Sequence, residues 1–352
     1  MRCIVKPKST LQRDVKKLHI HPDRKDKIKL DLNENLMGCS LKVVEALKKI
    51  TCDDVSVYPE YDTFIDKLSS YLNVENNNLI LTNGADEALR IIMDTYLDKN
   101  DEIIIPTPTF YIFETYSEVI GANKKQVYYN EDLSFPVEDI LDEITDKTKM
   151  IAIVNPNNPT GTLAEKQDII RILEKAKNSI VLVDEAYFQF SNNSCKDLVN
   201  QYNNLIIVQT FSKGFGLAGL RLGYIISNEN VIENLNKIVL PYRVNGISIL
   251  AGSAALDDQD FLNHYVNLVV NNRSYLQEQL GNMGVRTFPS EANFIIANFG
   301  EKTDIVFEKL HEKGILVNNV SHLPLLNNCL RIAIGTKNQM DTLLDEIKEV
   351  LN

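Results

Sequence analysis

One lysine of this sequence lies between an apolar run and a cluster of glycines. Lys213 belongs to the stretch TFSKGFGLAG, residues 210–219, which follows the apolar run LIIVQ. Small and apolar neighbours disfavour the ammonium form of a lysine, because the charge loses its hydration, and they leave the free amine available as a nucleophile. The stretch therefore predicts a lysine that forms a Schiff base with a carbonyl compound.

The same stretch contains the pattern G-x-G-x-x-G, in the letters GFGLAG, which is typical of dinucleotide-binding loops. That function requires the glycines to follow a strand directly and to open a helix, with an acidic residue at the end of the next strand. Here the residues 211–213 intervene, a second apolar run, LRLGYII, follows Gly219, and the residue after that run is Ser227. The pattern therefore disfavours nicotinamide or flavin binding and favours a site built around the lysine.

Other residues that could bind a ligand through polar side chains or backbone N–H groups also follow apolar runs of the same region. They are Gly84, Ala85 and Asp86 after LILT, Asn158 after MIAIV, Asp184 and Tyr187 in and after IVLVD, and Thr210 and Ser212 after LIIVQ. A glycine turn that opens a helix can hold a phosphate through free N–H groups, although each segment also fits an ordinary turn or helix cap. Ligands of open α/β sheets bind beyond the carboxyl ends of the strands. We therefore expect one ligand site at this edge.

The elements that would position these residues indicate an α/β fold. Between about residues 79 and 226, stretches of helical length separate the apolar runs LILT, EIIIP, KKQVYY, MIAIV, IVLVD, LIIVQ and LGYII. Such alternation predicts a mostly parallel sheet covered by helices. Helices are expected next at about 231–238 and 261–280, followed by FIIANF, a helix, ILV, LRIAI and a closing helix. This second pattern predicts a smaller α+β domain.

The change of pattern divides the chain into three parts. Residues 1–35 are expected to form an arm that packs on the small domain, because they are polar and irregular. Residues 36–245 are expected to form the large domain, and residues 246–352 the small one.

Composition limits the classes of function. The chain has 352 residues, of which 44% are hydrophobic, so it can bury a substantial core. A net charge of −11 offers no basic face for a nucleic-acid backbone, and we expect no nucleic-acid partner. The N-terminus has charges where a signal peptide needs an apolar core, and no apolar run approaches the roughly 18 residues of a membrane helix, so no membrane partner is expected.

The cysteines and histidines suggest neither disulfides nor a metal. The five cysteines are odd in number, scattered and never in C-x-x-C spacing, which favours reduced thiols and a cytoplasmic protein. His19 and His21 are the only close pair of histidines, and no third ligand lies at a recognisable spacing. We therefore expect no metal site.

Five motifs together resemble a known family. TNGADEALRII, NPNNPTG, VDEAYFQF, TFSKGFGLAGLRLGY and LRIAIGT are similar to the motifs of fold-type I pyridoxal-phosphate aminotransferases, in the family's order and spacing. The likeness runs from about residue 30 to the C-terminus and is closest to the histidinol-phosphate aminotransferase branch. It implies a large domain with a mostly parallel seven-stranded sheet between helices, a smaller α+β domain, and amino transfer between an amino acid or related amine and a 2-oxo acid.

The resemblance also implies roles for the residues at the strand ends. Lys213 would form the Schiff base with pyridoxal 5'-phosphate and then act as general base. Asp184 would pair with the pyridinium nitrogen and keep it protonated. Tyr187 and Asn158 would donate hydrogen bonds to the phenolic oxygen of the cofactor, and Phe110 would stack on its ring, although Phe110 alone would suit a core aromatic.

The phosphate group of the cofactor would have its own set of residues in this resemblance. They are Gly84, Ala85 and Asp86 through the helix start, Thr210 and Ser212 through hydroxyls, and Arg221 through its charge. Tyr58 resembles the tyrosine that reaches the phosphate from the neighbouring subunit. The resemblance thus implies a homodimer with shared active sites.

The substrate side of the site matches the family less closely. Arg331 resembles the arginine that binds the substrate α-carboxylate, and Asn35 is a further candidate for substrate contact. Asn318 stands where the histidinol-phosphate branch has an arginine for the substrate phosphate, and Leu36 stands where proline is usual. A neutral amide replaces a charge-assisted hydrogen bond by an ordinary one, so histidinol phosphate is in doubt as substrate. Arg243 is a candidate for a positive charge from another direction.

Two other functions stay open at this point. The same lysine and cofactor support decarboxylation, and threonine-phosphate decarboxylases resemble this branch closely. A non-catalytic, effector-sensing aminotransferase-like protein is the alternative from another class. It would need an attached DNA-binding segment, for which the roughly 35 residues before the fold are too few.

Overall fold

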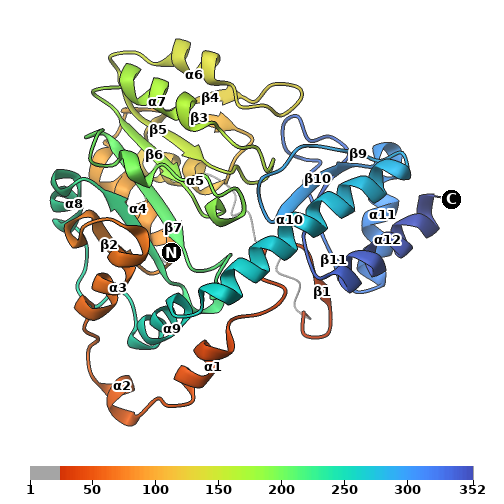
Figure 1. Ribbon diagram of the computed structural model, residues 1–352. Helices are drawn as coiled ribbons and strands as arrows, with labels where there is room; N and C mark the ends of the chain where they lie inside the picture. The colour runs from red at the N-terminus through yellow and green to blue at the C-terminus, as the bar shows by residue number, and fades with distance from the viewer. Residues whose placement is uncertain (1–23, 352) are drawn as a thin grey trace, which may run out of the picture.

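A computed structural model describes residues 24–351, drawn in colour in Figure 1. Residues 1–23 and Asn352 are not described. The candidate pair His19 and His21 and most of the expected arm therefore lie outside the described residues.

The larger sheet has seven strands in the order β2-β8-β7-β6-β5-β3-β4. Its strands are β2 (Leu79–Thr82), β3 (Glu102–Thr107), β4 (Asn123–Tyr128), β5 (Thr148–Val154), β6 (Ile180–Asp184), β7 (Leu205–Thr210) and β8 (Gly223–Ser227). All pairings are parallel except those of β8, which runs against both β2 and β7. Each strand coincides with one of the seven apolar runs, so the predicted fold class is confirmed.

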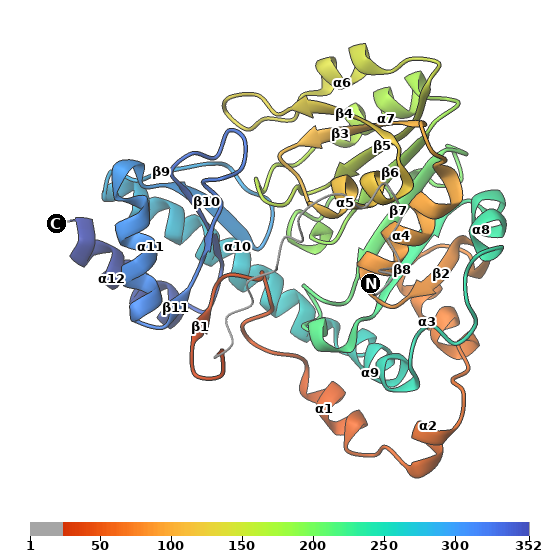
Figure 2. The same cartoon turned by 180° about the vertical axis from the view of Figure 1, so that it is seen from behind.

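Helices cover both faces of this sheet, and the views from opposite sides in Figure 1 and Figure 2 show them. Alternate residues of a strand point to opposite faces, so Ile206 packs on one side and Ile207 on the other. One face packs on α4 (Gly84–Tyr96), α5 (Ile112–Ile120) and α8 (Glu229–Asn236). The other face packs on α3 (Asp62–Leu72), α6 (Val137–Glu143), α7 (Lys166–Lys175) and α9 (Gly246–Leu256). Burial on both faces explains why the strands other than the edge strand β4 are mostly apolar runs.

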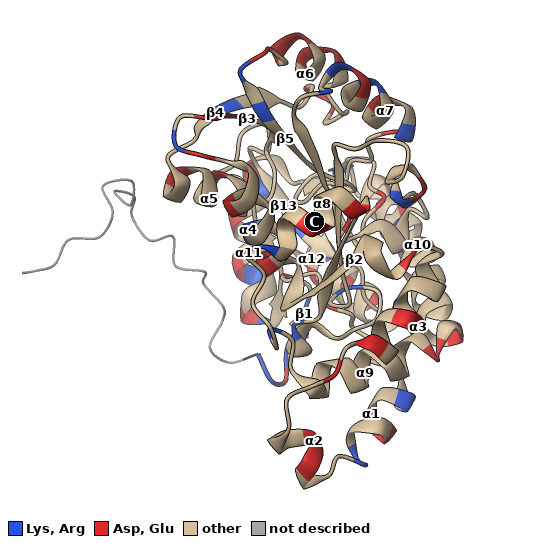
Figure 3. Cartoon of the chain, turned by 90° about the vertical axis from the view of Figure 1, so that its left-hand side faces the viewer, with Lys and Arg blue, Asp and Glu red and all other residues tan. Residues whose placement is uncertain are grey.

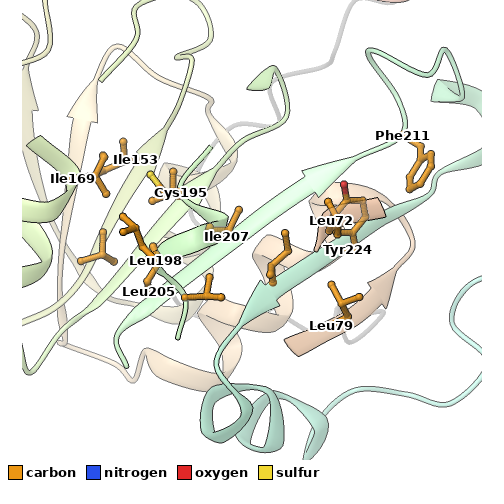
Figure 4. Packing of buried hydrophobic residues seen from close by; sticks show 14 of the residues in the cluster. Leu72, Leu79, Ile153, Ile169, Cys195, Leu198, Leu205, Ile207, Phe211 and Tyr224 are labelled. Carbon is orange, nitrogen blue, oxygen red and sulfur yellow. The ribbon is translucent and has the colours of Figure 1, made fainter. Parts of the chain in front are cut away.

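The core on the second face is shown from close by in Figure 4, where Ile153 and Ile207 lie among side chains from outside the strands. Leu198 and Cys195 come from the loop that follows β6 and complete this layer. Charged residues stay on the outside, and Figure 3 shows both signs along α6 and α7, where Arg171 pairs with Glu138. The apolar layer therefore fixes the strand ends, on which the polar residues of interest lie.

Four helices at the start and end of the larger part were not predicted. They are α1 (Leu41–Leu47), α2 (Cys52–Ser56), α3 and α9. The sequence of α9, GISILAGSAAL, is apolar or small on all sides, so it lacks the 3.6-residue periodicity by which a surface helix is predicted. In the structure α9 packs against α1 and α3.

The smaller sheet is antiparallel, with strand order β12-β13-β10-β9. Its strands are β9 (Arg286–Thr287), β10 (Phe294–Asn298), β12 (Asn318–Asn319) and β13 (Cys329–Ala333), and its helices are α10 (Gln259–Asn282), α11 (Thr303–Glu312) and α12 (Lys337–Leu351). All three helices pack on the face that carries Leu330 and Ile332. Arg331 lies between these two residues in the strand and therefore points to the opposite face.

The first described residues lie against this smaller part. Strand β1 (Ile28–Lys29) pairs in parallel with β11 (Ile315–Leu316). The Leu30 carbonyl then accepts a hydrogen bond from the Ala333 N–H over 3.0 Å. The long helix α10 contributes to both cores, through Leu262 on one side and through residues such as Leu276 on the other. The domain borders at 35/36 and 245/246 stay predictions.

Candidate active site

The strand ends bring the predicted polar residues together at one edge of the larger sheet. Asp184 is the last residue of β6 and Thr210 is the last residue of β7, and these two strands are neighbours. Asn158 lies in the loop that follows β5, the neighbour of β6 on the other side. Because these three strands are parallel, their carboxyl ends share one edge, as ligand sites in open α/β sheets require.

Lys213 lies three residues beyond β7, and its amine points into this edge. Nζ donates a hydrogen bond to the Leu32 carbonyl over 2.9 Å and lies 5.7 Å from the centroid of the Tyr187 ring. Burial lowers the pKa of Lys213 to about 8 from its ordinary 10.5, and the charge of Arg331 adds to this effect. A larger part of this amine is thus unprotonated near neutral pH than is usual for a lysine.

Asp184 is the buried carboxylate of the site, with 3% of its surface exposed. Its Oδ1 accepts a hydrogen bond from the Ala186 N–H over 3.0 Å. Burial raises the pKa of Asp184 to about 7, against the lowering effects of this hydrogen bond and of Lys213. A buried carboxyl group of this kind becomes a stable carboxylate when a cation lies beside it.

The start of α4 and the residues after β7 form a cradle for an anion. The side chain of Asn83, the residue before α4, makes no capping hydrogen bond, so it does not occupy the N–H groups of the first turn, which lie at the positive end of the helix dipole. The hydroxyls of Thr210 and Ser212 lie 2.9 Å apart. Arg221 adopts a φ of +51° and packs so closely that a Cβ on Gly84 would lie 2.6 Å from its Nη2. Glycine is favoured at the helix start, because Gly84 has a φ of +77°, which other residues rarely adopt, and because a Cβ would also displace the Arg221 guanidinium.

Asp86 makes one contact that was not predicted, through its side chain. Besides offering a backbone N–H in the first turn of α4, it forms an ion pair through its carboxylate with Arg221, with 2.9 Å between Oδ2 and Nη2. Ala85, the residue before it, lies at the same helix start and packs against the apolar core. The ion pair orients the guanidinium over the cradle.

Tyr187 and Asn158 lie on either side of this edge. The Tyr187 hydroxyl accepts a hydrogen bond from Nδ2 of Asn33 over 3.1 Å, and its ring meets Phe294 edge-on at 5.2 Å. Oδ1 of Asn158 accepts from Nη1 of Arg331 over 2.6 Å, which leaves its Nδ2 as a donor. Phe110, just before α5, is partly buried against the core next to α4.

Arg331 connects the smaller sheet to the larger one. Besides its bond to Asn158, its Nη2 donates to the Asp31 carbonyl over 2.5 Å. Only 7% of its surface is exposed, and its buried Nε has no hydrogen-bond partner among the described residues. Asn318 is the direct partner of Arg331 in the β12–β13 pairing. Directly opposed residues share a face, so Asn318 lies beside Arg331 on the side away from the helices.

The structure also places the remaining predicted residues. Asn35 donates through Nδ2 to the Gly214 carbonyl over 3.0 Å, beside Lys213. Arg243 donates from Nε to the Leu81 carbonyl and from Nη1 to the Leu240 carbonyl, so two of its donors are used on the backbone. Tyr58 is 72% exposed and stacks on Tyr242 with 4.3 Å between ring centroids. Within residues 24–351, no hydrogen bond or ring contact joins Tyr58 or Arg243 to Lys213 or Arg331.

The segment Asp31–Asn33 was not predicted as part of the site, yet it contacts Arg331, Lys213 and Tyr187. Its three consecutive carbonyls accept from Arg331, from Lys213 over 2.9 Å and from Asn293 over 3.1 Å. Every residue has a backbone carbonyl, so contacts of this kind cannot be predicted from residue types. The only sequence signal was the cluster of Asn and Asp in DLNEN, residue types that tolerate unusual backbone angles.

Comparison with known proteins settles the family. The family described as aminotransferase class I and II matches residues 25–347 of the chain. The chain belongs to the class I and II aminotransferases. This aminotransferase is 36% identical over 328 residues to the histidinol-phosphate aminotransferase of Thermoanaerobacter sp. (strain X514), an alignment that covers 92% of this chain and 93% of that protein. The enzyme of the same name from Caldanaerobacter subterraneus is 36% identical over 331 residues, with 93% of each chain covered.

Solved structures show the same fold. The histidinol-phosphate aminotransferase from Clostridium acetobutylicum superposes on this aminotransferase with a TM-score of 0.86 at 23% identity, covering 92% of this chain and 99% of that one. The enzyme of that name from Sinorhizobium meliloti, in complex with pyridoxal-5'-phosphate, gives a TM-score of 0.85 at 23% identity, covering 92% and 90%. The resemblance predicted from the five motifs is confirmed. The two alternatives, a decarboxylase and a non-catalytic effector-sensing protein, are not favoured.

Proposed function

We propose that this protein is a pyridoxal-phosphate-dependent aminotransferase that moves an amino group between an amino acid, or a related amine, and a 2-oxo acid. One observation carries the proposal: the amine of Lys213 and the buried carboxyl of Asp184 follow neighbouring parallel strands at one edge of the sheet. Family membership supports the reaction class.

The side chains around Lys213 fit the phosphate of this cofactor. The uncapped N-terminus of α4, the hydroxyls of Thr210 and Ser212 and the guanidinium of Arg221 are donors suited to a phosphate dianion. Gly84 leaves the space that this cradle needs, since a Cβ there would collide with Arg221.

The other groups of the cofactor have matching residues too. Asp184 would hold the ring nitrogen in its protonated form, and its pKa of about 7 would fall beside that cation. Nδ2 of Asn158 and the hydroxyl of Tyr187 would donate to the phenolic oxygen. Phe110, partly buried before α5, would cover one face of the ring.

When bound, the cofactor supplies an electron sink into which the electrons of a breaking bond at the substrate α-carbon can move. Nζ of Lys213 would hold the aldehyde group of the cofactor, and the same amine, when free, would take the substrate α-proton as general base. Its lowered pKa of about 8 provides the free amine for both tasks near neutral pH. Arg331 orients the substrate by binding its α-carboxylate with two donors.

The substrate side chain is proposed to lack a phosphate. Asn318 lies directly opposite Arg331 and presents a neutral amide to the space beside it. A phosphate dianion there would lose the charge-assisted hydrogen bonds that a guanidinium supplies. Arg243 does not replace that charge readily, because its Nε and Nη1 already donate to the Leu81 and Leu240 carbonyls. Asn35, beside Gly214, is proposed as a further substrate contact.

We also propose a homodimer with shared active sites that works in the cytoplasm. Tyr58 stacks on Tyr242, and other exposed apolar residues lie next to these two in the sequence; the group is called here the Tyr58 patch. The patch consists of Val55, Val57, Tyr58, Leu240 and Tyr242, each more than half exposed at 67%, 66%, 72%, 70% and 53%. Exposed apolar groups of this size are typical of protein interfaces. No helix of residues 24–351 is both long and apolar enough to span a membrane.

The decisive experiment traps the link to Lys213. The protein is mixed with pyridoxal phosphate, reduced with borohydride, digested and analysed by mass spectrometry, and the added mass is expected on the peptide that contains Lys213. Lys213→Ala should lose this mass, the visible absorbance band and turnover. Lys196→Ala is the matched control, because Lys196 also has a pKa lowered by burial but bonds to the Leu72 carbonyl elsewhere. Turnover that survives in Lys213→Ala would overturn the proposal.

A further inference from the structure

Asn33 is a buried side chain of the site to which neither the motifs nor the proposed function gives a role. It is 1% exposed and has a φ of +54°. Its Nδ2 donates to the hydroxyl oxygen of Tyr187 over 3.1 Å, across 154 positions of the sequence. Its Oδ1 is buried and has no hydrogen-bond partner among the described residues. A buried amide with one free oxygen is uncommon unless a ligand or a function explains it.

The smaller part of the molecule holds Asn33 in place. The Leu30 carbonyl accepts from the Ala333 N–H over 3.0 Å, and the Asn33 carbonyl accepts from Nδ2 of Asn293 over 3.1 Å. Between them, the Leu32 carbonyl accepts from Lys213. The left-handed φ is one that asparagine tolerates better than most residues. Asn33 is therefore fixed from both sides, and its amide has little freedom to leave Tyr187.

This amide constrains the proton of the Tyr187 hydroxyl. A tyrosine hydroxyl has one proton to donate, while its oxygen can accept. The NH₂ group of Asn33 can only donate, so it takes an acceptor position on the oxygen and cannot receive the hydroxyl proton. The proton must point to another acceptor. Because Nζ of Lys213 lies 5.7 Å from the centroid of the Tyr187 ring, the phenolic oxygen of a cofactor held by Lys213 would be that acceptor.

We propose that Asn33 is a positioning residue that keeps the Tyr187 hydroxyl turned as a donor toward the cofactor and so sets the proton affinity of the Lys213 Schiff base. The inference rests on the proposed function. A hydrogen bond donated to the phenolic oxygen draws charge from it, and that charge otherwise stabilises a proton on the neighbouring Schiff-base nitrogen. Losing the orientation of Tyr187 should therefore raise the pKa of that nitrogen.

The test uses Asn33→Gly, which removes the amide and accepts the positive φ without strain. The pKa of the Schiff-base nitrogen is read from the pH dependence of visible absorbance in the protein loaded with pyridoxal phosphate. We expect a rise of about half to one pH unit, the effect of one weakened hydrogen bond. Asn33→Ala also strains the backbone, but it loses the same amide. It should therefore show the same rise in the pKa of the Schiff-base nitrogen. A rise in Asn33→Ala alone would assign the effect to the backbone and overturn the proposal.

Two comparisons make the test specific to Tyr187. In a Tyr187→Phe background, Asn33→Gly should produce no further rise, because the hydroxyl it orients is gone. Asn78→Ala is the matched control for losing a buried asparagine amide, since Asn78 is 2% exposed and donates to the Ser227 carbonyl in the larger part. It should leave the pKa of the Schiff-base nitrogen unchanged. An equal rise in the Tyr187→Phe background would overturn the proposal.

A readout without cofactor separates this inference from the proposed function. Tyrosine labelled with ¹³C at Cζ gives one resonance that disappears in Tyr187→Phe, and this resonance should move in Asn33→Gly in the cofactor-free protein. If it moves but wild type forms no Schiff base, the proposed function fails while the contact stands. If it does not move, Asn33 does not act on Tyr187 and the inference fails, whatever the enzyme's activity.

Discussion

Asn318→Arg should make the protein more selective for phosphorylated substrates. Asn318 is paired with Arg331 across β12 and β13, and both side chains lie on the face away from α10, α11 and α12. Arg331 also contacts Asn158 of the larger part, so this face borders the proposed site. An arginine at position 318 would therefore add a guanidinium beside the space for the substrate side chain.

The size of the effect follows from the type of hydrogen bond. A neutral hydrogen bond contributes about 0.5–1.5 kcal/mol, and one to a charged group about 1.5–3 kcal/mol. The difference of about 1–2 kcal/mol corresponds to roughly 5- to 30-fold in kcat/KM. Asn318 is partly buried and Arg331 is only 7% exposed, so solvent screening reduces the gain less than it would on an open surface.

The assay compares an amino alcohol phosphate with the same amino alcohol without phosphate. The ratio of their kcat/KM values should rise by the factor given above in Asn318→Arg. Asn319→Arg is the matched control, because Asn319 pairs with Leu330 on the opposite face and its Nδ2 faces Asp304 of α11. An unchanged ratio in Asn318→Arg, or an equal rise in Asn319→Arg, would refute the placement of the substrate side chain.

Three further predictions concern the stability of the cofactor-free protein, the dimer and cofactor binding. Burial raises the pKa of Asp184 from 3.8 to about 7, so ionisation favours the unfolded chain and stability falls as the pH rises from about 4 to about 7. Asp184→Asn should therefore gain up to about 4 kcal/mol in urea unfolding at pH 8 and almost nothing at pH 4, and an equal gain at both would contradict the shifted pKa. Light scattering should give twice the 39.9 kDa of one chain, and Leu240→Glu in the Tyr58 patch should halve that mass. Tyr58→Phe should keep the dimer but weaken cofactor binding; a Leu240→Glu protein that stays dimeric would place the interface elsewhere.

The larger sheet was predictable because parallel strands are buried on both faces. The runs LILT to LGYII are short, and all except KKQVYY are mostly apolar; every one of them became a strand, and KKQVYY formed the edge strand β4. Two-residue strands such as β1 and β12 have no such signal, because two residues show no period. Helix α9 was not predicted, because its residues are apolar or small on all sides and leave no polar face to mark a helical period.

The residues of the site were predictable where their types carry the chemistry, but their neighbours were not. Lys213 and Asp184 follow apolar runs, and an edge shared by parallel strands brings such residues together. The sequence of apolar runs does not predict which strands are neighbours in the sheet. Arg221 meets Gly84 because β8 pairs with β2, which places Gly223 so close to Gly84 that a Cβ on Gly223 would lie 2.7 Å from its carbonyl carbon.

The contacts of Arg331 explain how its buried guanidinium avoids a large desolvation cost. Its Nη1 and Nη2 donate to Asn158 and to the Asp31 carbonyl, both neutral acceptors. A substrate carboxylate would replace neutral acceptors by charged ones, and charge-assisted bonds are roughly twice as strong. An amine without a carboxylate gains nothing from this exchange. Because the Asp31 carbonyl belongs to the segment that holds Lys213 through Leu32, a carboxylate bound at Arg331 would release one end of that segment. The guanidinium of Arg331 and the amine of Lys213 thus bind the carbonyls of two consecutive residues, Asp31 and Leu32.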